Sequence, residues 1–176
     1  DAQQLARQFK EAAAGYGQIL TDNLLPARTA EVLQRQIEAL ALAGEYAESD
    51  RLCERFRQSY PDSALLPAVL FRSAENMQFL SQAAGRDPAR AKEAAKLAEE
   101  AARRYQLVID KFPEFEYVGV ARLELGLIAY RKGEYEKARE AFEDFINRYP
   151  DSEKVTQARE NLKTLEGGAS KGSLEI

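Results

Sequence analysis

The fold is decided by residues 44–63, GEYAESDRLCERFRQSYPDS, which return in diverged form as residues 133–152, GEYEKAREAFEDFINRYPDS. Gly44 is equivalent to Gly133 and Ser63 to Ser152, so the offset stays at 89 residues. A constant offset over a helix-length window is typical of a repeat array, in which each unit buries its apolar face against its neighbours. Such arrays mostly hold other molecules rather than transform them. The pattern therefore predicts a binding protein without identifying its partner.

The composition is that of an ordinary globular protein. The chain has 176 residues, of which 45% are apolar and 31% charged, so it can bury one sizeable core. With 25 Lys plus Arg against 29 Asp plus Glu, the net charge of −4 disfavours nucleic acid as a partner. No apolar run is long enough to span a bilayer. We expect a protein or peptide partner and no direct membrane insertion, and leave open a lipid anchor upstream of Asp1.

The residue types most used in catalysis are scarce. The chain has no histidine, the side chain most used for proton transfer near neutral pH. Cys53 is the single cysteine, so neither an intrachain disulfide nor a zinc site of several thiolates can form. No glycine-rich loop precedes a helix in a phosphate-binding pattern. We expect no catalytic residue, no metal and no cofactor, and hence a protein that is not an enzyme.

The apolar spacing is helical throughout, which predicts an all-α fold. Gly44 suits a left-handed helix terminator, and Asp87 before Pro88 suits the start of a helix. Asp62 and Asp151 are placed to cap the helices that follow them. The predicted helices cover about residues 2–20, 27–43, 45–59, 64–84, 88–111, 117–131, 134–148 and 153–165.

Prolines 26, 61, 113 and 150 punctuate the chain at intervals of 35, 52 and 37 residues. Two intervals approach the 34 residues of a helical-hairpin repeat, and the middle one is about 18 residues too long. Shared between two helices, the excess adds about 13 Å to each, at 1.5 Å per residue. We expect an elongated central hairpin around Gly85.

A repeat family is indicated by Leu125, Gly126, Ala129, Gly133, Ala138, Phe142 and Pro150. Their spacing resembles the tetratricopeptide repeat, where small residues let two antiparallel helices touch and an aromatic ring fills the gap. The resemblance is good over 117–152 and weaker over 30–63, where Ser49 replaces alanine and Cys53 an aromatic. It extends over 64–113 through Ala101, Tyr105 and Pro113.

The resemblance implies a right-handed α-solenoid of antiparallel helix pairs. We assign residues 1–26 to an N-terminal helix that ends a preceding repeat. Residues 27–166 form the repeat domain, with about three repeats and a C-terminal capping helix. Residues 167–176 are rich in glycine and serine and are expected to form a flexible tail.

The repeat ends, Gly-Glu-Tyr and Tyr-Pro-Asp-Ser, are similar to those of a bacterial envelope subgroup. That subgroup includes the outer-membrane assembly lipoprotein and the periplasmic partner of the Tol-Pal system. The resemblance implies a scaffold or adaptor in a cell-envelope complex, periplasmic or associated with the outer membrane.

Two alternatives stay open. One is a structural segment of a longer cytoplasmic array. The other is a glycan-processing α-solenoid, which would need two carboxylates about 5 to 9.5 Å apart in one cleft. The sequence nominates no such pair, because Glu114 and Glu116 fall in a loop and are expected to be solvated.

In this family the first helix of each pair lines a groove that takes a peptide or a partner helix. The residues that the resemblance places there are Gln34, Glu38, Leu42, Arg72, Asn76, Phe79, Leu123, Leu127 and Tyr130. Glu38 disfavours a carboxylate ligand in this groove. Alternatively, Leu123 and Leu127 are covered by the last helix through Val155, Ala158, Leu162 and Leu165.

A second candidate contact surface is the long hairpin. It carries Met77, Phe79 and Leu80, with the cations Arg86, Arg90, Lys92 and Lys96 near its tip. Unpaired apolar residues on an overhang usually mark a contact surface. The alternative is that these residues pack on the first helix of this chain. Cys53 is expected to be a small buried apolar residue and not a nucleophile.

Overall fold

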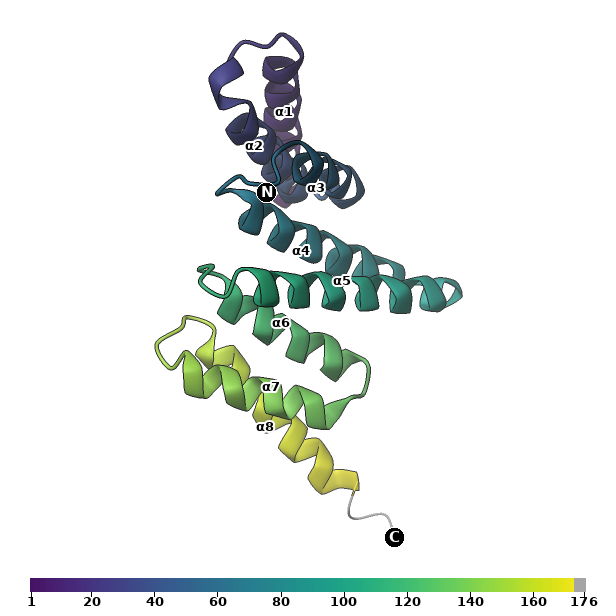
Figure 1. Ribbon diagram of the computed structural model, residues 1–176. Coiled ribbons are helices and arrows are strands. Elements are labelled where there is room, and N and C mark those ends of the chain that lie inside the picture. Colours follow the sequence, from purple (N-terminus) through teal and green to yellow (C-terminus); the bar gives the residue numbers. More distant parts are fainter. Residues whose placement is uncertain (173–176) are drawn as a thin grey trace. The chain divides into compact units, whose positions relative to one another are not determined.

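The computed structural model describes residues 1–172, and in that part of the chain it contains helices and no strand (Figure 1). The predicted all-α fold of antiparallel helix pairs is confirmed. The α-helices are α1 (Ala2–Thr21), α2 (Thr29–Leu42), α3 (Tyr46–Ser59), α4 (Leu66–Ala84), α5 (Ala91–Lys111), α6 (Val118–Arg131), α7 (Tyr135–Arg148) and α8 (Val155–Gly172). Short 3₁₀ turns, Pro26–Arg28 and Pro88–Arg90, precede α2 and α5.

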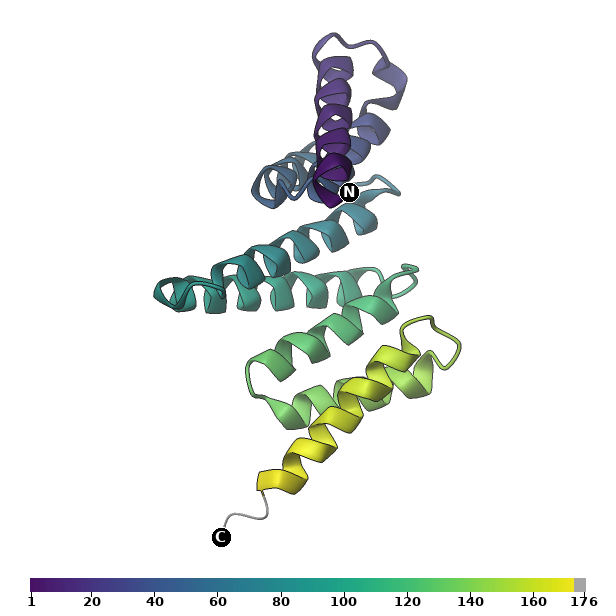
Figure 2. The same cartoon turned by 180° about the vertical axis from the view of Figure 1, so that it is seen from behind.

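The chain divides into two compact units, the first of residues 1–104 and the second from Tyr105 onward. In the first unit α1 packs on α2, α2 on α3, and α3 on α4. In the second unit α6 packs on α7 and α7 on α8, as both views show (Figures 1 and 2). Helices α2–α4 and α6–α8 begin at positions that are each 89 residues apart, so each unit contains one three-helix module of the same design.

The turn inside each module is fixed by a glycine with positive φ, at 82° for Gly44 and 78° for Gly133. The amide of Gly44 donates to the carbonyl of Ala41 at 3.0 Å, and that of Glu45 to Leu40 at 2.9 Å. Gly133 and Glu134 repeat both bonds at 3.0 and 2.9 Å. This pairing ends a helix with a left-handed residue and satisfies its last carbonyls. The prediction that Gly44 terminates its helix is confirmed.

The turn between the second and third helices of each module is held by serine, not by aspartate. The hydroxyl of Ser63 accepts from the amide of Leu65 at 3.2 Å, and that of Ser152 accepts from Lys154 at 3.3 Å. The prediction that Asp62 and Asp151 cap these helices is wrong, because α4 begins at Leu66 and α8 at Val155, four residues beyond each aspartate. Asp87 does accept from the amide of Ala89 at 2.9 Å, as predicted.

Helix α8 continues to Gly172, past the predicted end at residue 165. Gly167 lowers helix propensity, but no proline follows it and the helical hydrogen bonds continue. The remainder of the predicted tail, residues 173–176, lies outside the described residues.

The elongated central hairpin is confirmed. Helix α4 has 19 residues and α5 has 21, whereas α2, α3, α6 and α7 have 14 each. Its two helices approach closely in the first unit, where the Ser81 hydroxyl donates to the carbonyl of Ala94 at 2.8 Å. The excess over a 14-residue helix is five and seven residues, somewhat less than the sequence estimate.

The interiors of the two modules differ at equivalent positions. In the second module Gly126 faces Phe142, and a Cβ on Gly126 would lie 2.9 Å from the Phe142 ring and 2.8 Å from the Ala141 methyl. The equivalent residues of the first module are Ile37 and Cys53, both buried. A large residue on one helix is therefore matched by a small one on the other, with the order reversed between modules.

The polarity of the interior also differs between the two modules. In the first module the Asn76 amide donates to the Ser49 hydroxyl at 2.9 Å, and that hydroxyl donates to the Ile37 carbonyl at 2.9 Å. All three residues are fully buried. The second module has Ala138 and Leu165 at the positions of Ser49 and Asn76, within one apolar cluster.

Candidate protein-binding face

One face of the first unit combines exposed apolar side chains with an ion pair. Helix α2 contributes Gln34, Glu38 and Leu42, and α4 contributes Arg72 and Phe79. Leu42 is 53% exposed and Phe79 is 38% exposed. Large apolar residues left open on a folded unit are where a partner gains most from burial.

The ion pair fixes the polar part of this face. A guanidinium nitrogen of Arg72 lies 2.6 Å from a Glu38 carboxylate oxygen, and the other lies 2.8 Å from Glu75. Burial disfavours the charge on Arg72, but the hydrogen bond to Glu38 and the fields of Glu75 and Glu38 together raise its pKa. Arg72 therefore stays charged and ties α4 to α2.

The aromatic part is held by stacking. The rings of Tyr46 at the start of α3 and Phe79 in α4 lie 4.8 Å apart with an interplanar angle of 18°. Stacking restrains the Phe79 ring while part of it stays exposed. Phe79 would therefore lose little rotamer freedom when a partner binds.

Two of the sequence-predicted groove residues are not on the surface. Asn76 is fully buried, and its side-chain amide donates to the Ser49 hydroxyl inside the module. Leu123 is also fully buried, in the cluster that includes Phe142, Ala158 and Leu165. The placement of both in a groove is wrong. The alternative in which the last helix covers Leu123 is confirmed, and Leu127 is partly buried against the same cluster.

The second unit exposes an aromatic pair of its own. Tyr130 at the end of α6 is 36% exposed and Tyr135 at the start of α7 is 56% exposed. Their ring centroids lie 5.9 Å apart at 55°. Of the predicted residues, the structure joins Glu38 to Arg72 in an ion pair, and Gln34 and Phe79 lie on the same two helices, four residues before Glu38 and seven after Arg72. Leu127 and Tyr130 belong to the second unit.

Sequence reasoning missed a polar network inside the first unit. Arg104 donates to Asp50 at 2.5 Å and to the Ser73 hydroxyl at 2.5 Å, and Ser73 donates to Asp50 at 2.7 Å. Arg104 also donates to Glu100 at 2.6 Å. The network joins α3, α4 and α5 and stabilises the base of the long hairpin. Only the four-residue spacing of Glu100 and Arg104 could have signalled it.

Glu100 has a strongly perturbed pKa. The hydrogen bond from Arg103 lowers it most, burial opposes this, and the bond and charge of Arg104 bring the pKa to about 2. Glu100 therefore stays ionised at any physiological pH.

The other singled-out residues have plain roles. Met77 is buried, whereas Phe79 stacks on Tyr46 of α3 and stays partly exposed. The cations Arg86, Arg90, Lys92 and Lys96 are exposed, and Arg90 pairs with Glu93 at 2.8 Å. Cys53 is buried, and burial raises the pKa of its thiol. Glu114 and Glu116 are exposed in their loop.

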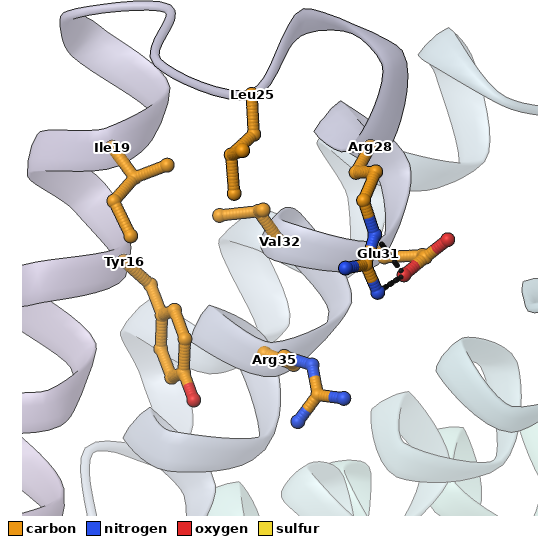
Figure 3. A pocket seen from close by; sticks show the side chains of 7 residues that line it. All are labelled: Tyr16, Ile19, Leu25, Arg28, Glu31, Val32 and Arg35. Atoms are coloured by element: carbon orange, nitrogen blue, oxygen red, sulfur yellow. Dashed lines mark hydrogen bonds and ion pairs between the residues drawn. The ribbon is translucent and has the colours of Figure 1, made fainter.

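Two hollows lie beside α2 in the first unit, and sequence reasoning found neither. The first, of about 230 Å³, has an apolar wall of Ile19, Leu25 and Val32 (Figure 3). Tyr16, Arg28, Glu31 and Arg35 complete it. The second, of about 240 Å³, is mainly polar and is lined by Gly17, Leu20, Thr21, Gln36, Glu48, Arg51, Leu52 and Arg55.

Two other kinds of site are absent from the part of the chain that the structure describes. No helix in residues 1–172 is long and apolar enough to cross a membrane. Within the same residues, no group of three or more His, Cys, Asp or Glu side chains is arranged to hold a metal ion.

Two stretches of the chain, residues 31–63 and 120–152, each match the tetratricopeptide repeat family. These two stretches are α2 with α3 and α6 with α7, the first two helices of each module. Comparison with curated proteins gives no match. Helical repeats of this kind stack into extended surfaces that are typical of protein-interaction scaffolds.

Proposed function

We propose that the protein is an adaptor that binds a peptide or helix of another protein on the α2–α4 face of its first unit. The observation that carries the proposal is the exposure of Leu42 and Phe79 on the two helices that the Glu38–Arg72 ion pair joins. Apolar anchors next to an oriented charge pair give a partner both affinity and register. Tyr130 and Leu127 of the second unit are proposed as a further contact, and Gln34 is proposed as part of the first face.

The test is a competition measurement with the partner captured from the native host. Phe79→Ala should weaken binding about tenfold, because a partly buried aromatic anchor contributes about 1.4 kcal/mol or more. Tyr130→Ala should have a smaller effect. Tyr117→Ala is the matched control, since Tyr117 is an exposed aromatic residue outside both faces. Unchanged affinity in both Phe79→Ala and Tyr130→Ala would contradict the proposal.

We further propose that the complex belongs to the bacterial cell envelope. The support is the similarity of both repeat ends, Gly-Glu-Tyr and Tyr-Pro-Asp-Ser, to the envelope subgroup. Fractionation of cells that express the full-length gene product tests this. Release with the periplasmic or outer-membrane fraction is expected. Recovery only with the cytosol would contradict the location and favour the longer cytoplasmic array. It would not affect the proposed binding face.

A further inference from the structure

We propose that the hollow between α1 and α2 is an anchor site for a partner segment that carries an aliphatic side chain beside a carboxylate. This proposal rests on the protein-binding function above and adds a second contact to it. The hollow lies within the first unit and is formed by α1, the Leu25 turn and the first half of α2 (Figure 3).

The size of the hollow suits a side chain rather than a whole ligand. Its volume is about 230 Å³. Sites for drug-sized molecules begin at about 300 Å³ and enclose most of the ligand. The hollow is open on one side, so a residue presented by a protein surface can enter it.

One end of the hollow is apolar. Ile19 and Leu25 line the wall, and the buried Val32 lies below them (Figure 3). Leu25 is 44% exposed, and the adjacent Leu24 is exposed as well. Covering these side chains would remove apolar surface from water, which an aliphatic anchor can do.

The other end carries an unmatched positive charge. Arg28 forms two hydrogen bonds to Glu31. Arg35, further along α2, forms no ion pair within residues 1–172, although its charge, after the hydrogen bond and charge of Arg28, helps to lower the pKa of Glu31. Two guanidiniums against one carboxylate leave a net charge of about +1 by simple count. The Tyr16 hydroxyl lies at the same end as Arg35, away from Leu25 (Figure 3).

Charge complementarity selects the occupant. A carboxylate beside the anchor could accept hydrogen bonds from the Arg35 guanidinium, which offers several donors in one plane. A cationic neighbour would be repelled by Arg28 and Arg35. A neutral neighbour would cover Arg35 without replacing its hydration, which is unfavourable.

The test uses two peptide probes that differ only in charge, acetyl-Leu-Glu-amide and acetyl-Leu-Gln-amide. The protein is labelled at Ile, Leu and Val methyl groups, and each probe is titrated while the methyl resonances of Ile19, Leu25 and Val32 are followed by NMR. Affinity is expected in the millimolar range, because the probes are small. The Glu probe should shift these methyls and bind about three- to tenfold more tightly than the Gln probe.

Variants separate the charge from the cavity. Arg35→Gln should remove the preference for the Glu probe, whereas Arg7→Gln, which deletes an exposed charge elsewhere on α1, should keep it. Leu25→Ser should weaken both probes. Equal binding of the two probes to the wild type, or shifts confined to other methyls, would overturn the proposal. So would concentration-dependent shifts at these methyls without probe, which would indicate a second copy of this chain as the occupant.

Failure here is distinguishable from failure of the proposed function. The titration uses no partner protein and reports only on the hollow. Loss of partner binding in Phe79→Ala with no probe binding would leave the adaptor function standing and remove the anchor site. Unchanged partner binding in Phe79→Ala and Tyr130→Ala, together with tighter binding of the Glu probe, would remove the proposed α2–α4 face and leave the anchor site standing.

Discussion

Helices α2–α4 and α6–α8 share one backbone plan but fill it differently. The first module keeps a buried polar chain from Asn76 through Ser49 to the Ile37 carbonyl, while the second has leucine and alanine at the same two positions. In the first module Phe79 also stacks on Tyr46. In the second module the residue equivalent to Phe79 is Gly168, and Tyr135, the equivalent of Tyr46, is largely exposed. The turn that ends at a glycine and the spacing of the helices therefore define the shared backbone plan. The interior residues can differ between the modules, provided that facing side chains match in volume and in hydrogen bonding.

The largest expected effect comes from breaking the size match in the second module. Gly126→Ile should destabilise the protein by roughly 3 kcal/mol or more, because even a Cβ meets Ala141 and Phe142 at 2.8 and 2.9 Å. Phe142→Cys should cost roughly 3 kcal/mol through the cavity it leaves. The double variant, which copies the first module, should be more stable than the two losses together predict. Urea unfolding followed by far-UV circular dichroism measures all three.

This double-variant cycle has a clear failing outcome. Strict additivity of the two losses would mean that the large and small residues are not coupled, and the reversed order between modules would then be coincidence.

The polar pair of the first module gives the next effect. Ser49→Ala should cost about 1–3 kcal/mol, because it leaves the buried Asn76 amide without its acceptor. Ser49→Ala combined with Asn76→Leu copies the second module and should be close to neutral, since both polar partners are removed together. A double variant less stable than Ser49→Ala alone would show that leucine does not fit the first module.

The two turn glycines should respond alike. Gly44→Ala and Gly133→Ala each force a side chain into the left-handed region and should cost about 1–2 kcal/mol. No atom lies within 4 Å of either added Cβ, so the cost is conformational and not steric. Hydrogen exchange of α2–α3 and of α6–α7 measures each turn separately. Clearly unequal losses would contradict a shared backbone plan.

The smallest effect concerns acid stability of the first unit. Glu100 has a pKa of about 2 in the folded protein against 4.5 for an unperturbed glutamate. Its stabilisation is thus complete above about pH 4.5 and is lost as the pH falls toward 2, with a size of about 1 kcal/mol after allowance for its partial exposure. Glu100→Gln should lower stability at pH 7 but flatten the loss between pH 4.5 and 2. An unchanged acid slope would contradict this role.

Most of the architecture could be predicted from the sequence, because periodicity, prolines and Gly44 fix helix ends locally. The end of α8 could not, since a glycine pair weakens a helix without ending it. The residues of the candidate site are harder to predict from the sequence. The sequence assigns Asn76 and Leu123 to the helix face that their spacing suggests, but burial depends on which neighbour covers that face. The Asp50–Ser73–Arg104 network joins residues far apart in the chain, and the hollow beside Arg35 depends on how α1 packs on α2, so local spacing carries little signal for either.

The adaptor claim is tested most directly by photo-crosslinking. A benzophenone amino acid placed at Leu42, on the proposed face, is compared with one at Arg57 and one at Arg131, the position in the second module equivalent to Leu42. The account predicts strong crosslinking to the partner from position 42, weaker crosslinking from 131 and none from 57. Crosslinking from position 57 with none from 42 would contradict it.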